Sequence, residues 1–204
     1  MSDPFVTKNI LKWYDLNKRS LPWRKNVSKE KRQYNTLISE FMLQQTQVAT
    51  VIPYFNKFVK EIPNIKKLAS VDNKKLIKLW EGLGYYSRAR NLKKAAQSVI
   101  KNFNGVIPDN FDDLKSLSGI GDYTANAILA IAFNKPYIPL DGNVERIIKR
   151  YLYLKKEKEI QKENLIEKKS ILGFSNRSSD YAQALMEFGA LVCKPTNPLC
   201  CQCP

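Results

Sequence analysis

The sequence predicts an all-α fold, in one domain or two small ones. Apolar residues between the turn signals recur at helical spacing, and the strict alternation of a β-strand is nearly absent. The 204 residues, 44% hydrophobic and 11% aromatic, are enough to bury a substantial core. We expect a central helical domain over residues 22–135. The second lobe is expected to combine the N-terminal helix, within residues 1–21, with residues 136–204.

The first half of the chain is predicted to alternate between helices and polar turns. Residues 24–33 are polar and rich in lysine, which indicates an exposed loop. A helix then begins near Asn35 or Thr36 and extends to Pro53. One face of this helix collects the apolar residues Leu37, Phe41, Val48 and Ile52. Short amphipathic helices follow and stop at Gly82 and Gly84; their apolar residues are Ile65, Leu68, Leu76, Leu79 and Trp80.

Five further helices are expected in the rest of the chain, over residues 88–101, 114–117, 123–133, 143–154 and 181–192. The first of them turns five apolar residues inward, namely Leu92, Ala95, Ala96, Val99 and Ile100. Residues 105–111 contain Pro108 and indicate a loop. The charged run 155–169 is typical of a solvated helix face.

The charge of the chain favours a polyanionic partner. Lys and Arg number 34 against 19 Asp and Glu, which gives a formal net charge of +15. Cationic side chains displace counterions from phosphates and so bind nucleic acid with little regard to its sequence. An anionic membrane surface is the alternative. No apolar run approaches the roughly 20 residues that span a bilayer, and the N-terminus lacks a signal-peptide pattern, so we expect an intracellular protein outside the membrane.

The sequence contains no histidine, which restricts the chemistry it can perform. Ser-His and Cys-His catalysis and every His-ligated metal site are excluded, so a reaction would depend on carboxylates, Tyr, Lys or Cys. All four cysteines fall within the last dozen residues, at Cys193, Cys200, Cys201 and Cys203. This crowding favours a metal site over disulfide bridges.

A short glycine motif, Leu117-Ser-Gly-Ile-Gly121, lies between two predicted helices. Two glycines one residue apart allow a tight turn and bring bare backbone amides close to a ligand. Together with the helix N-terminus at Tyr123, these amides predict a site for a DNA phosphate. The alternative is an αα-hairpin that needs glycine for packing alone.

Three sequence blocks resemble a known family. The hairpin motif, followed by Tyr123-Thr-Ala and by Leu140-Asp-Gly-Asn-Val144, resembles the helix-hairpin-helix DNA glycosylase superfamily. Residues 39–55, SEFMLQQTQVATVIPYF, and residues 82–92, GLGYYSRARNL, resemble its MutY branch, the adenine DNA glycosylases. The resemblance covers roughly residues 10–204 and implies the two-lobed glycosylase fold with a C-terminal cysteine loop.

The resemblance implies that two carboxyl groups cleave an N-glycosidic bond. Glu40 would be the general acid that protonates adenine N7, and Asp141 would stay ionised beside the sugar as positive charge develops there. Each residue also has an ordinary alternative, Glu40 as a surface glutamate and Asp141 as a helix N-cap. Apolar neighbours on either side of Glu40 favour burial, which promotes a protonated carboxyl, and a helix N-terminus keeps Asp141 charged.

The resemblance also implies which residues contact the sugar and the phosphates. Lyases of the endonuclease III type carry a Schiff-base Lys at the position of Tyr123, so we expect hydrolysis without efficient strand cleavage. Tyr123 and Asn143 would assist around the sugar. The residues expected to bind DNA phosphate are Gly119, Gly121, Tyr123 and Thr124.

A flipped base needs a pocket, and the gap it leaves in the duplex needs a wedge. By resemblance, Trp23, Arg24 and Gln183 would line the adenine pocket. Gln45 and Tyr85 would enter the duplex near the opposing 8-oxoguanine or guanine. Trp23 could equally be a core aromatic residue.

The cysteine spacing resembles the iron–sulfur loop of the same families. Cys193, Cys200 and Cys203 would hold a [4Fe-4S] cluster, which normally takes four thiolates. The fourth cysteine would come six positions after Cys203, beyond Pro204, so we expect a truncated sequence that also lacks a Nudix-like domain. An absent or incomplete cluster and a zinc ion are the alternatives.

The resemblance thus implies a monomeric, monofunctional glycosylase acting on double-stranded DNA that contains adenine opposite 8-oxoguanine or guanine. We expect it in the cytoplasm, associated with the nucleoid if the source is bacterial. A mismatch-specific thymine glycosylase is the nearest alternative, since some of that branch also carry Tyr at the position of Tyr123. A DNA-binding fragment without catalysis is the alternative from another class.

Overall fold

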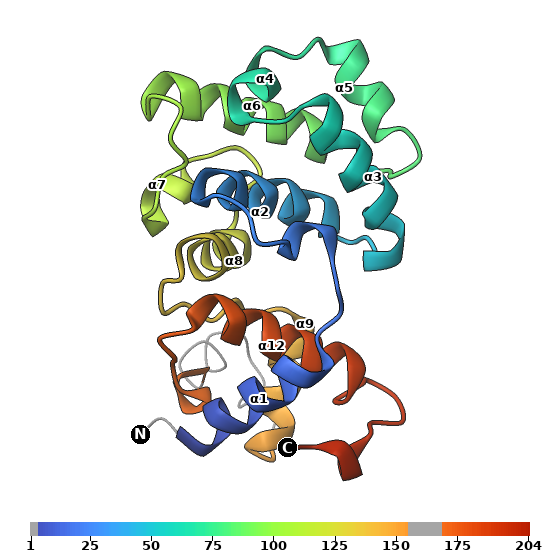
Figure 1. Cartoon of the computed structure of the whole chain (residues 1–204), viewed down its shortest axis with the longest axis vertical. Coiled ribbons are helices and arrows are strands. Elements are labelled where there is room, and N and C mark those ends of the chain that lie inside the picture. Colours follow the sequence, from blue (N-terminus) through green and yellow to red (C-terminus); the bar gives the residue numbers. More distant parts are fainter. Residues whose placement is uncertain (1–3, 155–168) are drawn as a thin grey trace. The chain divides into compact units, whose positions relative to one another are not determined.

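The computed structural model describes residues 4–154 and 169–204. Within these ranges the chain forms α-helices and short 3₁₀-helices and no β-strand, which confirms the predicted all-α class (Figure 1). It divides into two compact units. The central unit is Ser20–Ile128, and the terminal unit combines Met1–Arg19 with Leu129–Pro204.

The central unit is built around one deeply buried helix, α2. Its elements are η1 (Pro22–Arg24), α2 (Lys29–Leu43), α3 (Val48–Glu61), α4 (Ile65–Ser70), α5 (Asn73–Trp80), α6 (Ser87–Asn102), α7 (Phe111–Lys115) and the greater part of α8 (Asp122–Phe133). Ten successive residues of α2, 33–42, are buried. Helices α3 and α6 pack against α2, α4 packs against α6, and α5 against α3 (Figure 1). A helix buried on every face fixes its side chains firmly, which suits a helix that carries a candidate acid.

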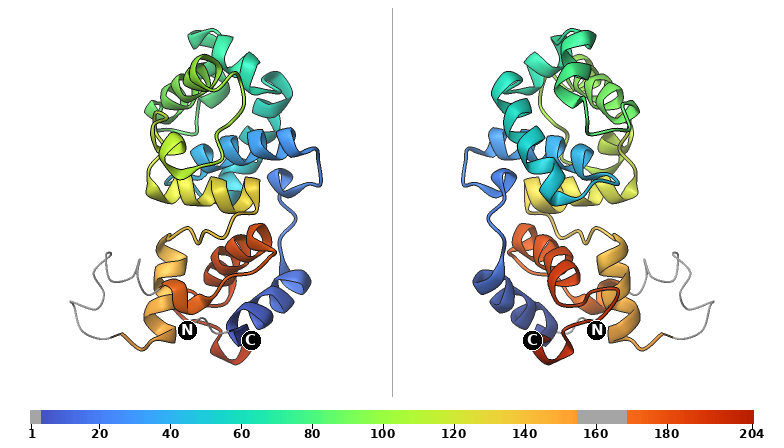
Figure 2. Two further views of the ribbon diagram at one scale, coloured as in Figure 1. Left: turned by 90° about the vertical axis from the view of Figure 1, so that its left-hand side faces the viewer. Right: turned by 90° about the vertical axis from the view of Figure 1, so that its right-hand side faces the viewer.

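The terminal unit joins the two ends of the chain. Its elements are α1 (Pro4–Asn17), α9 (Gly142–Tyr151), η2 (Lys169–Leu172), α12 (Ser178–Leu191) and η3 (Cys200–Gln202). Helix α12 packs against both α1 and α9, and Figure 2 shows α1 and α12 side by side in both views. The carboxylate of Glu187, 1% exposed, accepts two hydrogen bonds from the Arg19 guanidinium at 2.7 and 2.9 Å. A buried carboxylate needs such a partner, so this pair ties the end of α1 to α12.

The single helix predicted from Asn35 to Pro53 is wrong, because two helices occupy this part of the chain. Helix α2 begins at Lys29, within the predicted loop, where the Ser28 hydroxyl accepts a hydrogen bond from the Lys31 amide at 3.3 Å. The chain then breaks at residues 44–47 and resumes as α3. Pro53 lies inside α3 and does not end it. The proline removes one backbone hydrogen bond of the helix, and the burial of neighbouring apolar residues offsets that loss.

Two smaller differences from the sequence prediction concern the start of α7 and the exposure of Ile100. The brief helix predicted over residues 114–117 begins earlier, at Phe111, because the Asn110 side chain caps it by accepting from the Asp113 amide at 2.9 Å. Ile100, expected to face inward, is exposed near the end of α6. The predicted helix over residues 155–169 lies almost wholly outside the described residues. No helix among the described residues is long and apolar enough to cross a membrane.

Candidate active site

Glu40 is a carboxyl group buried in the middle of a helix. It lies on α2 and is 5% exposed, between Ser39 and Phe41, which are also buried. The alternative of a surface glutamate is therefore wrong. Burial in a medium of low polarity favours the uncharged form of a carboxyl group, and that form can donate a proton.

The glycine hairpin packs directly against the helix that carries Glu40. Gly119 has a φ of +82°, and a Cβ there would approach Phe41 Cε1 to 2.8 Å and Asn91 Cβ to 2.9 Å. The amide of Gln44, just past α2, donates to the Gly119 carbonyl at 3.4 Å. The packing alternative therefore accounts for Gly119. It does not account for Gly121, where a Cβ would meet no atom within 4 Å.

Gly121 directly precedes the N-terminus of α8. Asp122, Tyr123 and Thr124 form the first turn of this helix, whose backbone amides have no carbonyl partner within the helix. Thr124 is buried, 4% exposed. The Lys115 ammonium pairs with the Asp122 carboxylate and offsets a charge that would otherwise repel a phosphate.

Asp141 is the N-cap of α9, as the helix-cap interpretation of this residue predicts. Its Oδ1 accepts from the backbone amides of Asn143 at 3.0 Å and Val144 at 2.8 Å. Its Oδ2 accepts from the Asn143 side-chain amide at 2.8 Å. A carboxylate offers about four acceptor positions, so the cap leaves Asp141 capacity for a further interaction. The residue is only partly buried.

The side chain of Asn143 is held from both ends. Its Nδ2 donates to Asp141, and its Oδ1 accepts from Arg146 Nη2 at 2.8 Å. Arg146 in turn donates to the carbonyl oxygens of Gly189 and Cys193, each at 2.7 Å. A Cβ on Gly189 would lie 2.5 Å from Asn143 Cβ, so α12 approaches α9 closely at this point. The orientation of the Asp141 carboxylate therefore depends on contacts that reach α12 and the segment after it.

The three residues expected at the adenine pocket are distributed over both units. Trp23 and Arg24 lie in η1 of the central unit, and the Trp23 ring meets the Phe55 ring edge-on at 5.3 Å. Gln183 lies on α12 of the terminal unit, is buried, and donates its Nε2 to the Ser179 carbonyl at 3.0 Å. The core-aromatic alternative for Trp23 thus has a packing contact in its support.

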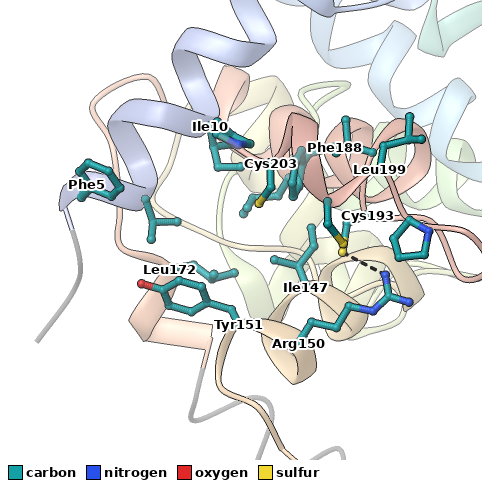
Figure 3. A pocket seen from close by; sticks show the side chains of 16 residues that line it. Phe5, Ile10, Ile147, Arg150, Tyr151, Leu172, Phe188, Cys193, Leu199 and Cys203 are labelled. Carbon is teal, nitrogen blue, oxygen red and sulfur yellow. Dashed lines mark hydrogen bonds between the residues drawn. The ribbon is translucent and has the colours of Figure 1, made fainter.

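Three of the four cysteines line one apolar pocket of about 260 Å³ in the terminal unit, shown in Figure 3. These are Cys193, Cys200 and Cys203. Burial, and then the neighbouring Cys193 and Cys200, raise the pKa of the Cys203 thiol. Among the described residues, however, no three Cys, Asp or Glu side chains are arranged to hold a metal ion. The donor chemistry suits an iron–sulfur cluster, but this set is one thiolate short of the four a cluster takes.

The family follows from the part of the chain that holds the hairpin and both carboxyl groups. Residues 38–172 match the model of the HhH-GPD superfamily base excision DNA repair proteins. The chain belongs to this superfamily. The predicted helix-hairpin-helix class is thereby confirmed.

Relatives of this HhH-GPD protein include enzymes named adenine DNA glycosylase. The chain is 42% identical to the Rattus norvegicus enzyme, over 97% of this chain and 40% of that protein. It is 43% identical to the enzyme of Buchnera aphidicola from Acyrthosiphon pisum, over 100% of this chain and 58% of that protein. The human enzyme is 41% identical, over 96% of this chain and 37% of that protein. The chain thus spans about half the length of the relatives it matches.

Solved HhH-GPD structures share the fold. A thermostable thymine-DNA glycosylase is 25% identical with a TM-score of 0.81, covering 98% of this chain and 91% of that one. A trapped endonuclease III–DNA covalent intermediate, 23% identical with a TM-score of 0.77, covers 98% of this chain and 90% of that one. The second likeness concerns the fold alone.

Two arginines of this HhH-GPD protein form hydrogen bonds with candidate site residues or with the segments beside them, and the sequence did not predict these contacts. Arg146 donates a hydrogen bond to the side chain of Asn143. Arg88 donates hydrogen bonds to residues on both sides of Gln45 and to the residue before Tyr85. One signal was available for Arg88: it lies in the first turn of α6, where a cation opposes the helix dipole. Such an unfavourable placement indicates that the side chain forms hydrogen bonds with residues outside its own helix.

Proposed function

We propose that this HhH-GPD protein removes adenine from double-stranded DNA in which adenine is mispaired with 8-oxoguanine or guanine. The observation that carries the proposal is its 41–43% identity, over nearly the whole chain, to proteins named adenine DNA glycosylase. The net charge of +15 supports a duplex partner. We further propose that it acts as a monomer, in the cytoplasm and at the nucleoid if the source is bacterial, and that it has two functional lobes that divide near residues 22 and 135.

The buried acid would begin the reaction. Glu40 donates its carboxyl proton to adenine N7, and the glycosidic bond breaks with its electron pair going to the base. The sugar is left with positive charge at C1′. Water adds there, and the Glu40 carboxylate helps to remove its proton, so the group returns to its starting form.

The second carboxyl would stabilise the charged sugar. Asp141 is ionised in this proposal, as expected for an acceptor of two backbone amides at a helix N-terminus. Asn143, fixed by Arg146, aims the carboxylate through its 2.8 Å hydrogen bond to Oδ2. Tyr123 has no amine with which to form a Schiff base, so it assists at the sugar and the strand is not cut efficiently.

The remaining predicted residues would bind DNA and the flipped base. Gly119, Gly121, Tyr123 and Thr124 hold a phosphate through backbone amides at the start of α8. The adenine pocket would be lined by Trp23, Arg24 and Gln183, and the duplex would be entered by Gln45 and Tyr85. We propose Cys193, Cys200 and Cys203 as three ligands of a [4Fe-4S] cluster, to which no step of the reaction is assigned.

A single incision experiment separates the proposed reaction from its alternatives. The 204-residue protein is incubated with duplexes containing A:8-oxoG, A:G, T:G and thymine glycol, each with and without alkali. We expect strand breaks on the adenine duplexes only after alkali, and none with Glu40→Gln. Release from T:G instead would favour a thymine glycosylase, the second candidate, which the likeness to the thymine-DNA glycosylase structure supports. Binding without any release would favour the non-catalytic alternative.

The partner can be tested independently of catalysis. If the basic surface neutralises duplex phosphates, binding should weaken with salt at a logarithmic slope of about −0.9 per neutralised phosphate. Titration of a fluorescent duplex at several salt concentrations measures this slope. A flat response would exclude duplex DNA as the partner.

A further inference from the structure

Two exposed residues on different loops of the central unit share an uncommon backbone conformation. Gln45, between α2 and α3, has a φ of 56°, and Tyr85, between α5 and α6, has a φ of 47°. Residues with a side chain adopt this left-handed region only where their surroundings hold them there. Tyr85 is 61% exposed, so the burial of its own ring does not supply that restraint.

One buried side chain, Arg88, which is 6% exposed, forms hydrogen bonds with both loops. Its Nη1 donates to four groups on either side of Gln45: the carbonyl oxygens of Phe41 at 3.4 Å, Met42 at 2.9 Å and Gln44, and the hydroxyl of Thr46 at 3.0 Å. Its Nη2 donates to the two carbonyl oxygens that precede Tyr85, those of Leu83 at 3.1 Å and Gly84 at 3.2 Å. One planar group therefore fixes the end of α2 and the loop before α6.

Aromatic contacts complete the arrangement. The Arg88 guanidinium lies 5.4 Å from the centre of the Tyr85 ring and 5.7 Å from that of Trp80. The Trp80 indole donates to the Gly84 carbonyl at 3.1 Å, which the guanidinium also bonds. The five donors of a guanidinium lie in a rigid fork, and the compact ammonium of a lysine cannot bond both loops in this way.

We propose that Arg88 is a positioning residue that holds Gln45 and Tyr85 together as one preformed wedge for the DNA duplex. The inference rests on the proposed function, in which these two residues enter the duplex. Unstacking a base costs energy, and a wedge that is already ordered loses less conformational entropy when it inserts. Because one guanidinium bonds both loops, its loss releases Gln45 and Tyr85 at the same time.

The test uses Arg88→Lys in the full chain, with Arg90→Lys as the matched control. Arg90 lies on the same helix, is exposed, and undergoes the same change without loss of charge. The probe is a duplex with 2-aminopurine beside an A:8-oxoG pair, whose fluorescence rises when the neighbouring stack opens. We expect wild type and Arg90→Lys to give the full rise at saturation. Arg88→Lys should bind the duplex and shift the opening equilibrium about 10- to 100-fold towards the stacked form, as loss of charge-assisted hydrogen bonds implies.

A wild-type rise in folded Arg88→Lys would overturn the proposal, and so would the absence of any rise with the wild-type protein. If Arg88→Lys does not fold, Thr46→Val removes a single acceptor of the guanidinium, and a partial loss of the rise is expected. Full fluorescence in that variant would then reject the clamp.

A double-mutant cycle supplies a readout that a general loss of stability would not move. Gln45→Ala and Tyr85→Ala should each reduce the rise in the wild-type background and have little further effect in Arg88→Lys. Additive effects would mean that the arginine does not act through these residues. The fluorescence does not require base release, so a protein that opens the stack without releasing adenine would contradict the proposed function and leave the clamp supported.

Discussion

The two candidate carboxyl groups occupy opposite kinds of position in their units. Glu40 lies within α2 of the central unit, among residues that are themselves buried. Asp141 lies at the start of α9 in the terminal unit, only partly buried, and accepts hydrogen bonds from three N–H groups of Asn143 and Val144. The same functional group thus lies inside a packed helix in one unit and caps a helix in the other.

The comparison also shows that the two groups depend on different parts of the fold. The surroundings of Glu40 are created by the packing of α2 against α3 and α6. Those of Asp141 are created by hydrogen bonds that run through Asn143 to Arg146. Changes in packing should therefore disturb Glu40, and changes in polar contacts should disturb Asp141.

The largest expected effect is that of Glu40→Gln. The amide keeps the shape of the side chain but cannot donate a carboxyl proton, so single-turnover release of adenine from A:8-oxoG duplex should fall by about 10² to 10⁴. Glu30→Gln, at an exposed position on the same helix, is the control and should release adenine normally. Circular dichroism and duplex binding should be unchanged in both. Wild-type release by folded Glu40→Gln would remove Glu40 from the mechanism.

Asp141→Asn should have the next largest effect, about 100-fold on the same step, because it removes the charge opposite the developing cation. Asparagine caps a helix nearly as well as aspartate, so α9 should persist. Asp72 offers a matched control, since it caps α5 by accepting from the Lys74 and Lys75 amides at 2.8 and 3.3 Å. Asp72→Asn should leave release intact. If both variants behave alike, Asp141 is a cap and nothing more.

The hairpin glycines sharpen the comparison between packing and ligand binding. Gly119→Ala should lower the free energy of unfolding by about 1 to 3 kcal/mol, because it combines a positive φ with a clash against Phe41. Gly121→Ala has open space, so its stability should stay within about 0.5 kcal/mol while its duplex binding weakens. Urea unfolding and duplex titration measure the two quantities. Equal loss of stability in both variants would assign both glycines to packing.

The smallest effect concerns an exposed ion pair of the terminal unit. The hydrogen bonds from Arg177 lower the pKa of Asp15 below its ordinary value of 3.8. The stability that this pair contributes is therefore present above the unfolded pKa and is lost as the pH falls through the lower folded pKa. Both side chains are partly exposed, so Asp15→Asn should cost only about 0.5 kcal/mol at neutral pH. The unfolding free energies of variant and wild type should converge in acid; a constant difference would refute the assignment.

The sequence predicted what depends on local pattern. The spacing of Leu37 and Phe41 predicted the helical part of the chain that became α2, and Asp141 before Gly-Asn-Val located the cap of α9. The break at Gln45 escaped prediction, because the hydrogen bonds that hold it come from Arg88, 42 residues or more along the chain. The roles of Asn143 and Arg146 escaped equally, since Arg146 bonds Gly189 across 43 residues. Contacts of this length leave no periodic signature.

The close approach of α9 and α12 makes one position with no functional group of its own critical to the orientation of the Asp141 carboxylate. A Cβ at Gly189 would lie 2.5 Å from Asn143 Cβ and 3.1 Å from its Cα, so a side chain there must displace backbone. Such a displacement would rotate Asn143 and, with it, the carboxylate that Asn143 aims. In the proposed reaction, position 189 is therefore restricted by the size of its side chain, whereas position 141 is restricted by its chemistry.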